Sequence, residues 1–190
     1  MIQILELIKL LGLGIASLII CTITMADIKN TKDFMKAIDE VRKEYPEESV
    51  ESKIPSSFKA TVAATETGNF QFKDAPTAQN ANNYFGMKPV GDQKFLTTTG
   101  GVNIASFDDP KASVRAFINL ITTDGRYKSV KESTDKIQDM FKGMSPYAER
   151  EDYTDFLANV YNDRIKPIVE TQNMLIPKAK PLNQQMNNLK

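Results

Sequence analysis

Apolar residues recur at helical spacing in several separate segments, and this pattern constrains the fold more than any other feature of the chain. The first stripe contains Phe34, Ile38, Val41 and Tyr45, which fall at positions i, i+4, i+7 and i+11. Further stripes run through residues 58–63, 114–121, 130–141 and 153–161. The third of these five stripes is regular and the fourth is weaker. The spacing therefore predicts a mainly helical fold.

Residues that begin or end helices flank the first two stripes. Thr31 is the expected N-cap of the first helix, and Pro46 is expected to stop it. Ser56 or Ser57 is the expected cap of the second helix, which Gly68 can end. The polar segment EESVESK between the two helices is expected to be a linker.

One segment departs from the helical period. KFLTTT, Gly100-Gly101 and VNIASF together predict a small β-hairpin. Asp109 and Pro110 then begin the next helix as N-cap and first residue. Residues 69–93 lack a clear period and are expected to be a loop with a short helix. The predicted class is α+β, mostly α, with one small hairpin.

The N-terminal segment carries a targeting signal. Residues 10–23 contain no charge, Lys9 precedes them, and small residues lead to Ala26. Residues 1–26 are either a signal peptide cleaved after Ala26 or a signal anchor in the inner membrane. Both interpretations export the rest of the chain to the periplasm or cell envelope. We expect one domain over 27–166 and a polar C-terminal tail over 167–190.

Composition excludes several kinds of chemistry. The chain has no His and one Cys, Cys21, which removes Ser-His-Asp and Cys-His catalysis, His-ligated zinc and intramolecular disulfides. The 24 basic and 24 acidic residues cancel, so charge gives no reason to expect a nucleic-acid partner. We expect no metal and no cofactor. Catalysis must then depend on carboxylates, Tyr, Ser, Thr or Lys.

Glu66 is the first candidate for such chemistry. It lies eight residues after Phe58 and four after Val62, so it continues the apolar face of its helix. A carboxyl group on an inward face loses hydration, which raises its pKa and suits a general acid. The alternative is a solvated Glu in the last helical turn.

The second candidate is the run NNYFGMK over residues 82–88. Its two amides can bond hydroxyl or acetamido groups, and its two aromatic rings can stack on a sugar. The alternative is an ordinary turn.

Together these segments resemble the bacterial peptidoglycan glucosaminidase domain. The resemblance begins with ATETGNF and NNYFGMKP, which match the family's Glu-Ser/Thr-Gly helix end and its Asn-Asn-aromatic-aromatic-Gly motif. It continues through SFDDPKASVRAFINLITTDGRYKSVKES and SPYAEREDYTDFLANVY. The match covers roughly residues 50–163 in order, and the stretch from Asn119 to Tyr127 is most similar to the Bax-type branch.

The resemblance implies a lysozyme-like fold and hydrolysis of the β-1,4 bond after N-acetylglucosamine in peptidoglycan strands. It places the catalytic acid on Glu66, the active-site tyrosine on Tyr147 and a companion aromatic on Tyr153. For Tyr153, helix packing is the competing role. The substrate-lining motif falls on Asn82, Asn83, Tyr84, Phe85 and Gly86.

The sequence departs from the family pattern in two places. Phe70 stands one residue after the usual Trp, where it is expected to supply the aromatic contact to substrate. The second carboxylate found on the hairpin of several members is missing, since no Asp or Glu lies between Asp92 and Asp108. Asp92 could approach from the loop, Thr97 to Thr99 could orient a water, or the substrate's acetamido group could assist a single Glu.

Two other functions remain open on the sequence. A lytic transglycosylase uses one catalytic Glu and leaves 1,6-anhydro ends in place of reducing ends. A non-catalytic module would bind cell-wall glycan without cleaving it, which the absent hairpin carboxylate allows.

Overall fold

The computed structural model of the chain describes residues 30–71 and 76–175, so the expected signal or anchor over 1–26 lies outside it. The helices in chain order are one over residues 30–42, α2 (Val50–Lys53), α3 (Ser56–Thr67), α4 (Pro76–Asn80), α5 (Pro110–Thr123), α6 (Lys128–Glu132), α7 (Ile137–Gly143), α8 (Tyr153–Val160) and α9 (Lys166–Leu175). A 3-10 turn over Gly125–Tyr127 precedes α6, and a π-helical turn over Tyr161–Ile165 joins α8 to α9. Strands β1 (Phe95–Thr97) and β2 (Asn103–Ala105) complete the fold.

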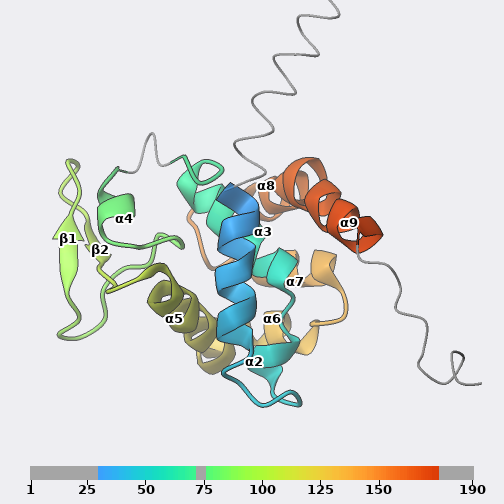
Figure 1. Cartoon of the computed structure of the whole chain (residues 1–190). Helices are drawn as coiled ribbons and strands as arrows, with labels where there is room; N and C mark the ends of the chain where they lie inside the picture. The colour runs from blue at the N-terminus through green and yellow to red at the C-terminus, as the bar shows by residue number, and fades with distance from the viewer. Residues whose placement is uncertain (1–29, 72–75, 176–190) are drawn as a thin grey trace, which may run out of the picture.

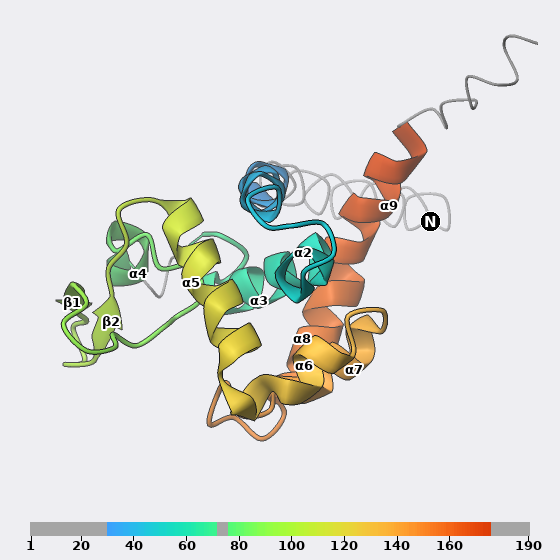
Figure 2. The same ribbon diagram turned by 90° about the horizontal axis from the view of Figure 1, so that it is seen from below.

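The predicted class is confirmed, because the described chain is mostly helical with one antiparallel hairpin. The hairpin and α4 lie at one side of the molecule, and α8 and α9 lie at the other (Figure 1). The view from below shows the same separation, with α5 and α3 between the two sides (Figure 2). Across residues 30–71 and 76–175, no helix combines the length and apolarity that crossing a membrane requires.

Helix α3 is the centre of the core. Its residues from Phe58 to Ala64 are all buried, which is typical of a helix surrounded by other elements. The ring of Phe58 stacks on Phe117 of α5 and Phe141 of α7, with centroids 6.4 and 5.7 Å away. Phe117 in turn stacks on Phe85 at 4.1 Å. This aromatic stack joins four segments that are distant in the sequence.

The hairpin is attached to the loop before it by hydrogen bonds. Phe95 pairs with Ala105 and Thr97 with Asn103, as the Gly100-Gly101 turn predicted. Ala105 N–H donates to the Met87 carbonyl at 2.9 Å, so the loop containing NNYFG pairs with β2. The position of that loop therefore depends on the hairpin.

Several predicted helix boundaries are confirmed and others are wrong. Gly68 ends α3 in the left-handed conformation, and Asp109 caps α5 with Pro110 at its first position. Thr31 is not an N-cap, because residue 30 is already helical, and this helix ends at residue 42 before reaching Tyr45. Ser56 is the first residue of α3 and caps nothing, since its hydroxyl donates to Asp39 at 2.5 Å.

Three segments expected to be irregular or continuous differ in the structure. The supposed linker EESVESK contains α2, whose N-cap Ser49 accepts from the Ser52 N–H. The single weak helix expected over 128–142 is divided into α6 and α7. Residues 167–175 of the expected tail are helical, and Ile168 is buried. Pro167 lies just after the π-helical turn, where the regular helical hydrogen-bond pattern is already interrupted.

Candidate active site

Glu66 lies in the last turn of α3, where local bonds fix the end of the helix. The Thr67 hydroxyl donates to the Ala63 carbonyl at 2.7 Å and accepts from the Phe70 N–H at 2.9 Å. Gly68 and the two residues after it all have positive φ, so the chain turns sharply away from the helix. The carboxylate of Glu66 therefore projects from a rigid helix end.

The Glu66 carboxylate is surrounded by protein and held by a tyrosine. Tyr153 donates its hydroxyl proton to Oε1 at 2.6 Å, and no other hydrogen-bond donor among the described residues contacts this carboxylate. Burial raises the pKa of Glu66, and the bond from Tyr153 opposes part of that rise. Tyr153 itself is 3% exposed, and burial beside the Glu66 charge raises its pKa. Glu66 thus has the environment that its sequence position predicted.

Gly86 lies against the other oxygen of the same carboxylate. A Cβ added to Gly86 would lie 2.8 Å from Glu66 Oε2, and its φ of +63° also favours glycine. The backbone conformation therefore favours glycine, and a side chain at this position would force the Glu66 carboxylate to shift. The NNYFG loop is in direct contact with Glu66 through its backbone.

Tyr147 connects this loop to the segment that carries Tyr153. Its hydroxyl donates to the Phe85 carbonyl, and its ring stacks on Tyr153 with centroids 6.1 Å apart and planes 15° apart. Burial and the nearby Glu66 charge raise the pKa of Tyr147 well above its usual value. Tyr147 is therefore a neutral hydrogen-bond donor that fixes the peptide just before Gly86.

The side-chain amides of Asn82 and Asn83 both form hydrogen bonds with the protein backbone. Asn83 is fully buried, donates to the carbonyls of Met87 and Ala105, and accepts from the Met87 N–H. Asn82 has a φ of +50° and donates to the Phe107 carbonyl at 3.0 Å. Both N–H groups and one lone pair of the Asn83 amide thus hold the backbone of the loop, and its contact with substrate stays a prediction. A sequence motif cannot distinguish an amide that binds sugar from one that holds a loop.

The aromatic residues expected at the substrate are largely in the core. Phe85 is fully buried in the aromatic stack, and Phe70 is 7% exposed in a cluster with Phe34. Tyr84 is half-buried and stacks on Phe34 at 4.4 Å. The ring of Phe85 packs in the core, whereas Phe70 and Tyr84 line a second cleft of about 390 Å³, so the expectation that these rings contact substrate stays a prediction.

A cleft of about 630 Å³ opens beside Glu66. Gly86, where an added Cβ would meet Glu66 Oε2, and Tyr147 both line it, so the cleft is adjacent to the candidate acid although Glu66 is not among its described lining residues. The residues lining the cleft are Gly86, Lys88, Pro89, Val90, Leu120, Arg126, Tyr127, Pro146, Tyr147, Ala148 and Glu149. Glu149 is exposed and is the one carboxylate among these lining residues of the described chain.

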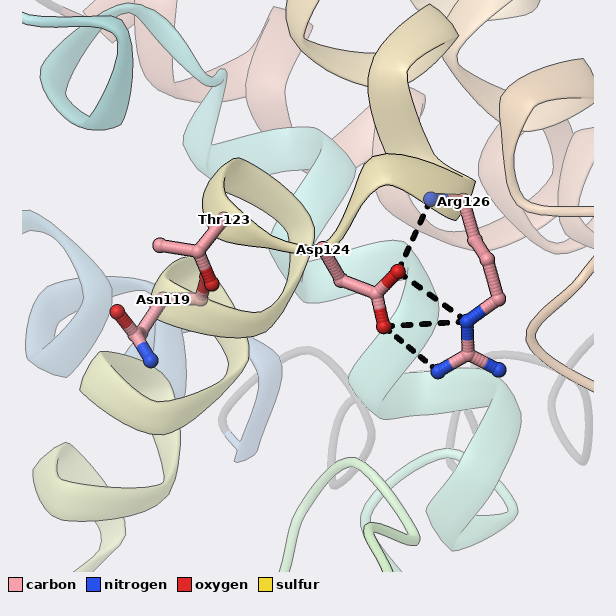
Figure 3. Close-up of polar contacts among 4 residues, drawn as sticks. All are labelled: Asn119, Thr123, Asp124 and Arg126. Atoms are coloured by element: carbon pink, nitrogen blue, oxygen red, sulfur yellow. Dashed lines mark hydrogen bonds and ion pairs between the residues drawn. The ribbon is translucent and has the colours of Figure 1, made fainter.

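The turn after α5 brings Arg126 and Tyr127 to this cleft. Asp124 accepts from the Arg126 backbone N–H at 2.9 Å and from the guanidinium at 2.7 Å (Figure 3). Thr123 donates to the Asn119 carbonyl at 2.7 Å one turn earlier, which completes the end of the helix. The Asp124 carboxylate therefore fixes both the turn and the side chain of Arg126.

The expected substitutes for a hairpin carboxylate do not line the cleft. Asp92 is exposed in the loop before β1, and it is absent from the cleft's described lining. Thr97 donates to Asn103, and Thr98 accepts from the Val102 N–H, so both hydroxyls serve the hairpin. Within residues 30–71 and 76–175, no group of three or more His, Cys, Asp or Glu is arranged to hold a metal ion.

Sequence reasoning missed two features of this site. It did not place Gly86 against Glu66, and it gave Glu149 no role. The spacing of the two tyrosines in SPYAEREDY was visible, but Glu149, Glu151 and Asp152 are equivalent acids in the sequence. Only the fold shows which of them lines the cleft.

Comparison with known proteins identifies the family. Residues 42–166 match the Glucosaminidase family model, described as mannosyl-glycoprotein endo-beta-N-acetylglucosaminidase. No curated protein matches the chain.

Solved structures share the fold at low identity. A peptidoglycan hydrolase mutant from Sphingomonas sp. A1 is 20% identical, covers 73% of this chain and 98% of its own, and has a TM-score of 0.56. The glycoside hydrolase domain of Salmonella typhimurium FlgJ is 19% identical over 84% of this chain and 99% of its own, with a TM-score of 0.55. The catalytic domain of the Listeria monocytogenes autolysin Auto is 15% identical over 73% and 84%, with a TM-score of 0.54.

The family expected from the sequence motifs and the lysozyme-like fold are both confirmed. The chain belongs to the mannosyl-glycoprotein endo-beta-N-acetylglucosaminidase family and is a glycoside hydrolase.

Proposed function

We propose that this chain hydrolyses the β-1,4 bond after N-acetylglucosamine in peptidoglycan, with Glu66 as the general acid. The observation that carries the proposal is the environment of Glu66. It is a shielded carboxyl group with a raised pKa, one tyrosine donor and an adjacent cleft. The names of the structural neighbours, which include peptidoglycan hydrolases, support the choice of substrate.

The two oxygens of Glu66 have different roles in this proposal. Oε1 accepts from Tyr153, so the transferable proton resides on Oε2, which lies against Gly86 at the edge of the cleft. A raised pKa increases the protonated fraction of Glu66 at any given pH, as suits a general acid. Glu66 then donates this proton to the leaving glycosidic oxygen. No cofactor is required for this chemistry.

Tyr147 and Tyr153 are positioning residues in this scheme. Tyr153 sets which oxygen of Glu66 carries the proton, and Tyr147 holds the Phe85–Gly86 peptide against it. Among the motif residues, Tyr84 and Asn82 keep some exposure and stay candidates for substrate contact.

The cellular location follows from the substrate. Peptidoglycan lies outside the cytoplasmic membrane, so the enzyme must be exported to the periplasm or cell envelope. A signal peptide or membrane anchor over residues 1–26 would achieve this. We also propose that the chain is nearest the Bax-type branch of the family, on the sequence of its Asn119-to-Tyr127 segment.

The test compares the full-length chain with Glu66→Gln on purified peptidoglycan, using mass spectrometry of the released fragments. We expect wild type to release fragments with reducible N-acetylglucosamine ends, and Glu66→Gln to release at least 100-fold less. Glu170→Gln, an exposed acid on α9, is the matched control and should resemble wild type.

Other products would change the proposal. Fragments with 1,6-anhydro-muramic ends would make the enzyme a lytic transglycosylase with the same acid. Binding to peptidoglycan without release of any fragment would contradict hydrolysis and support a glycan-binding module.

A further inference from the structure

The chemistry of glycoside hydrolysis leaves one role unfilled at this site. Most such enzymes use two carboxyl groups, one as acid and one as nucleophile or base. The hairpin carries no Asp or Glu between Asp92 and Asp108, so the second group must come from elsewhere if there is one. The lining of the cleft beside Glu66 suggests where to look.

Glu149 lines the cleft that lies next to the candidate acid. It shares this lining with Gly86, where an added Cβ would meet Glu66 Oε2. Among the described residues that line this cleft, it is the one carboxylate. Its exposure gives it access to the solvent water that hydrolysis consumes.

The segment carrying Glu149 is fixed relative to Glu66. Tyr147, two residues earlier, donates to the Phe85 carbonyl beside Gly86. The ring of Tyr147 also stacks on Tyr153, which donates to Glu66. The position of Glu149 is therefore linked, through Tyr147, to the Phe85–Gly86 peptide and to Tyr153.

Two basic side chains also line the cleft, and one of them, Arg126, is paired with Asp124. Lys88 faces the cleft from the NNYFG loop, and Arg126 faces it from the turn after α5. The other titratable groups at the cleft are Tyr127 and Tyr147, both kept neutral because burial raises the pKa of each. Glu151 and Asp152 are the nearest acids in sequence, and Asp152 is paired with Arg150.

The separation of the two carboxyl groups distinguishes a base from a nucleophile. A nucleophile lies about 5 Å from the acid, whereas a base lies about 6.5 to 9.5 Å away, with a water between them. Glu149 lines the cleft, whereas Glu66 is not among the described residues that line it, so the two carboxyl groups are not in contact. Glu149 is also exposed and can hold a solvent water, which favours a base over a nucleophile.

We propose that Glu149 is the general base of an inverting hydrolysis, a role that rests on the proposed function. Glu149 takes one proton from a water in the cleft as the water oxygen bonds to the anomeric carbon. The bond from that carbon to the glycosidic oxygen breaks, and its electron pair stays on the oxygen, which takes the proton of Glu66. Glu66 ends ionised and Glu149 protonated, and both exchange protons with solvent before the next turnover.

The test compares Glu149→Gln with Glu151→Gln, a matched change of an exposed acid two residues along the same loop. Each full-length variant is assayed on soluble peptidoglycan fragments for kcat, KM and pH dependence, and NMR identifies the first anomer released. We expect Glu149→Gln to lower kcat about 100-fold or more with KM little changed. We also expect it to abolish the acidic limb of the pH profile, which wild type and Glu151→Gln retain. Wild type should release the α-anomer first.

Three outcomes would overturn the inference. A kcat of Glu149→Gln within about fivefold of wild type would remove the base role and leave the proposed function standing. Release of the β-anomer first would also exclude an inverting base and would favour assistance by the acetamido group. Absence of cleavage by wild type would overturn the proposed function itself, and the base role with it. Equal melting temperatures of the two variants would exclude misfolding as the cause of a loss.

Discussion

The helical part of the molecule (30–71 and 108–175) and the hairpin part (76–107) are stabilised differently. The helical part has α3 enclosed on all sides and a stack of phenylalanine rings through its centre. Apart from Phe85, which joins that stack, the hairpin part buries a small apolar cluster of Ala78, Ala81 and Ile104 among the described residues. All three residues of β1 are exposed, and Phe95 is 51% exposed. Apolar packing therefore dominates one part and hydrogen bonding the other.

The candidate site lies where these two parts meet. Glu66 comes from the most enclosed helix, and Gly86 comes from the loop that hydrogen bonds attach to the hairpin. Glu66 is held by a well-packed helix, whereas the loop and hairpin opposite it have little apolar packing. This combination suits an enzyme that must admit a polymer and still hold its acid in place. Substitutions where Glu66 meets the loop at Gly86 should affect activity most. Substitutions within the helical part or within the hairpin part should mainly affect stability.

The largest effect is expected for Gly86→Ala. Its methyl group would lie 2.8 Å from Glu66 Oε2 and would displace the acid, so we expect kcat to fall at least 100-fold. Gly91→Ala is the matched control, because Gly91 has a similar φ of +57° and no atom near the added Cβ. Both variants carry a backbone strain of about 1 kcal/mol. Equal activity of the two variants would contradict the prediction that a side chain at position 86 displaces Glu66.

The next effect is expected for Asn83→Ala, which breaks the attachment of the loop. It removes three hydrogen bonds and takes the Asn83 partner from the Met87 N–H and the Ala105 carbonyl, whereas the Met87 carbonyl keeps its bond from the Ala105 N–H. We expect a loss of about 3 kcal/mol in the free energy of unfolding, measured by chemical denaturation. Hydrogen exchange should accelerate at the Ala105 amide more than in α3. Asn80→Ala, an exposed change on α4, is the control, and a similar loss there would contradict the argument.

The same comparison explains what the sequence could predict. Periodic apolar stripes anticipated the main helices, and Gly100-Gly101 anticipated the hairpin, because both signals are local. The motif residues anticipated the family and the position of Glu66. The buried role of Asn83 and the place of Glu149 depend on contacts between segments more than 20 residues apart, such as the bond from Asn83 to Ala105. No pattern of residue types near either position encodes such contacts.

A buried lysine gives a third prediction, confined to the helical part. Lys59 of α3 is fully buried and donates to the Ile54 carbonyl at 2.7 Å, and burial lowers its pKa to about 8. Below that pH the charged form destabilises the fold, since the unfolded chain holds the proton more tightly. We expect Lys59→Met to raise the free energy of unfolding at pH 7 by about 1–2 kcal/mol, after loss of the hydrogen bond.

The pH dependence of this change provides its check. Between pH 8 and 10.5 the unfolded state binds more protons at this site, so wild type gains stability as pH rises through that window. The advantage of Lys59→Met should therefore shrink between pH 7 and pH 10 in chemical denaturation. Lys36→Met, an exposed lysine on the helix over 30–42, should show no such trend. A constant difference across this range would mean that the pKa of Lys59 in the folded protein is not lowered from its value in the unfolded chain.

The smallest effect is expected for Tyr153→Phe, which removes one bond and keeps the ring. The bond from Tyr153 favours the ionised form of Glu66, so its loss raises the pKa of the acid further. The protonated form then persists to higher pH, and the alkaline limb of the kcat profile should shift upward by less than about one pH unit. Activity near neutral pH should change less than about tenfold, because the proton on Oε2 remains. Tyr161→Phe, which contacts Phe141 and not Glu66, should leave the limb in place. A downward shift for Tyr153→Phe would show that the tyrosine stabilises the protonated acid.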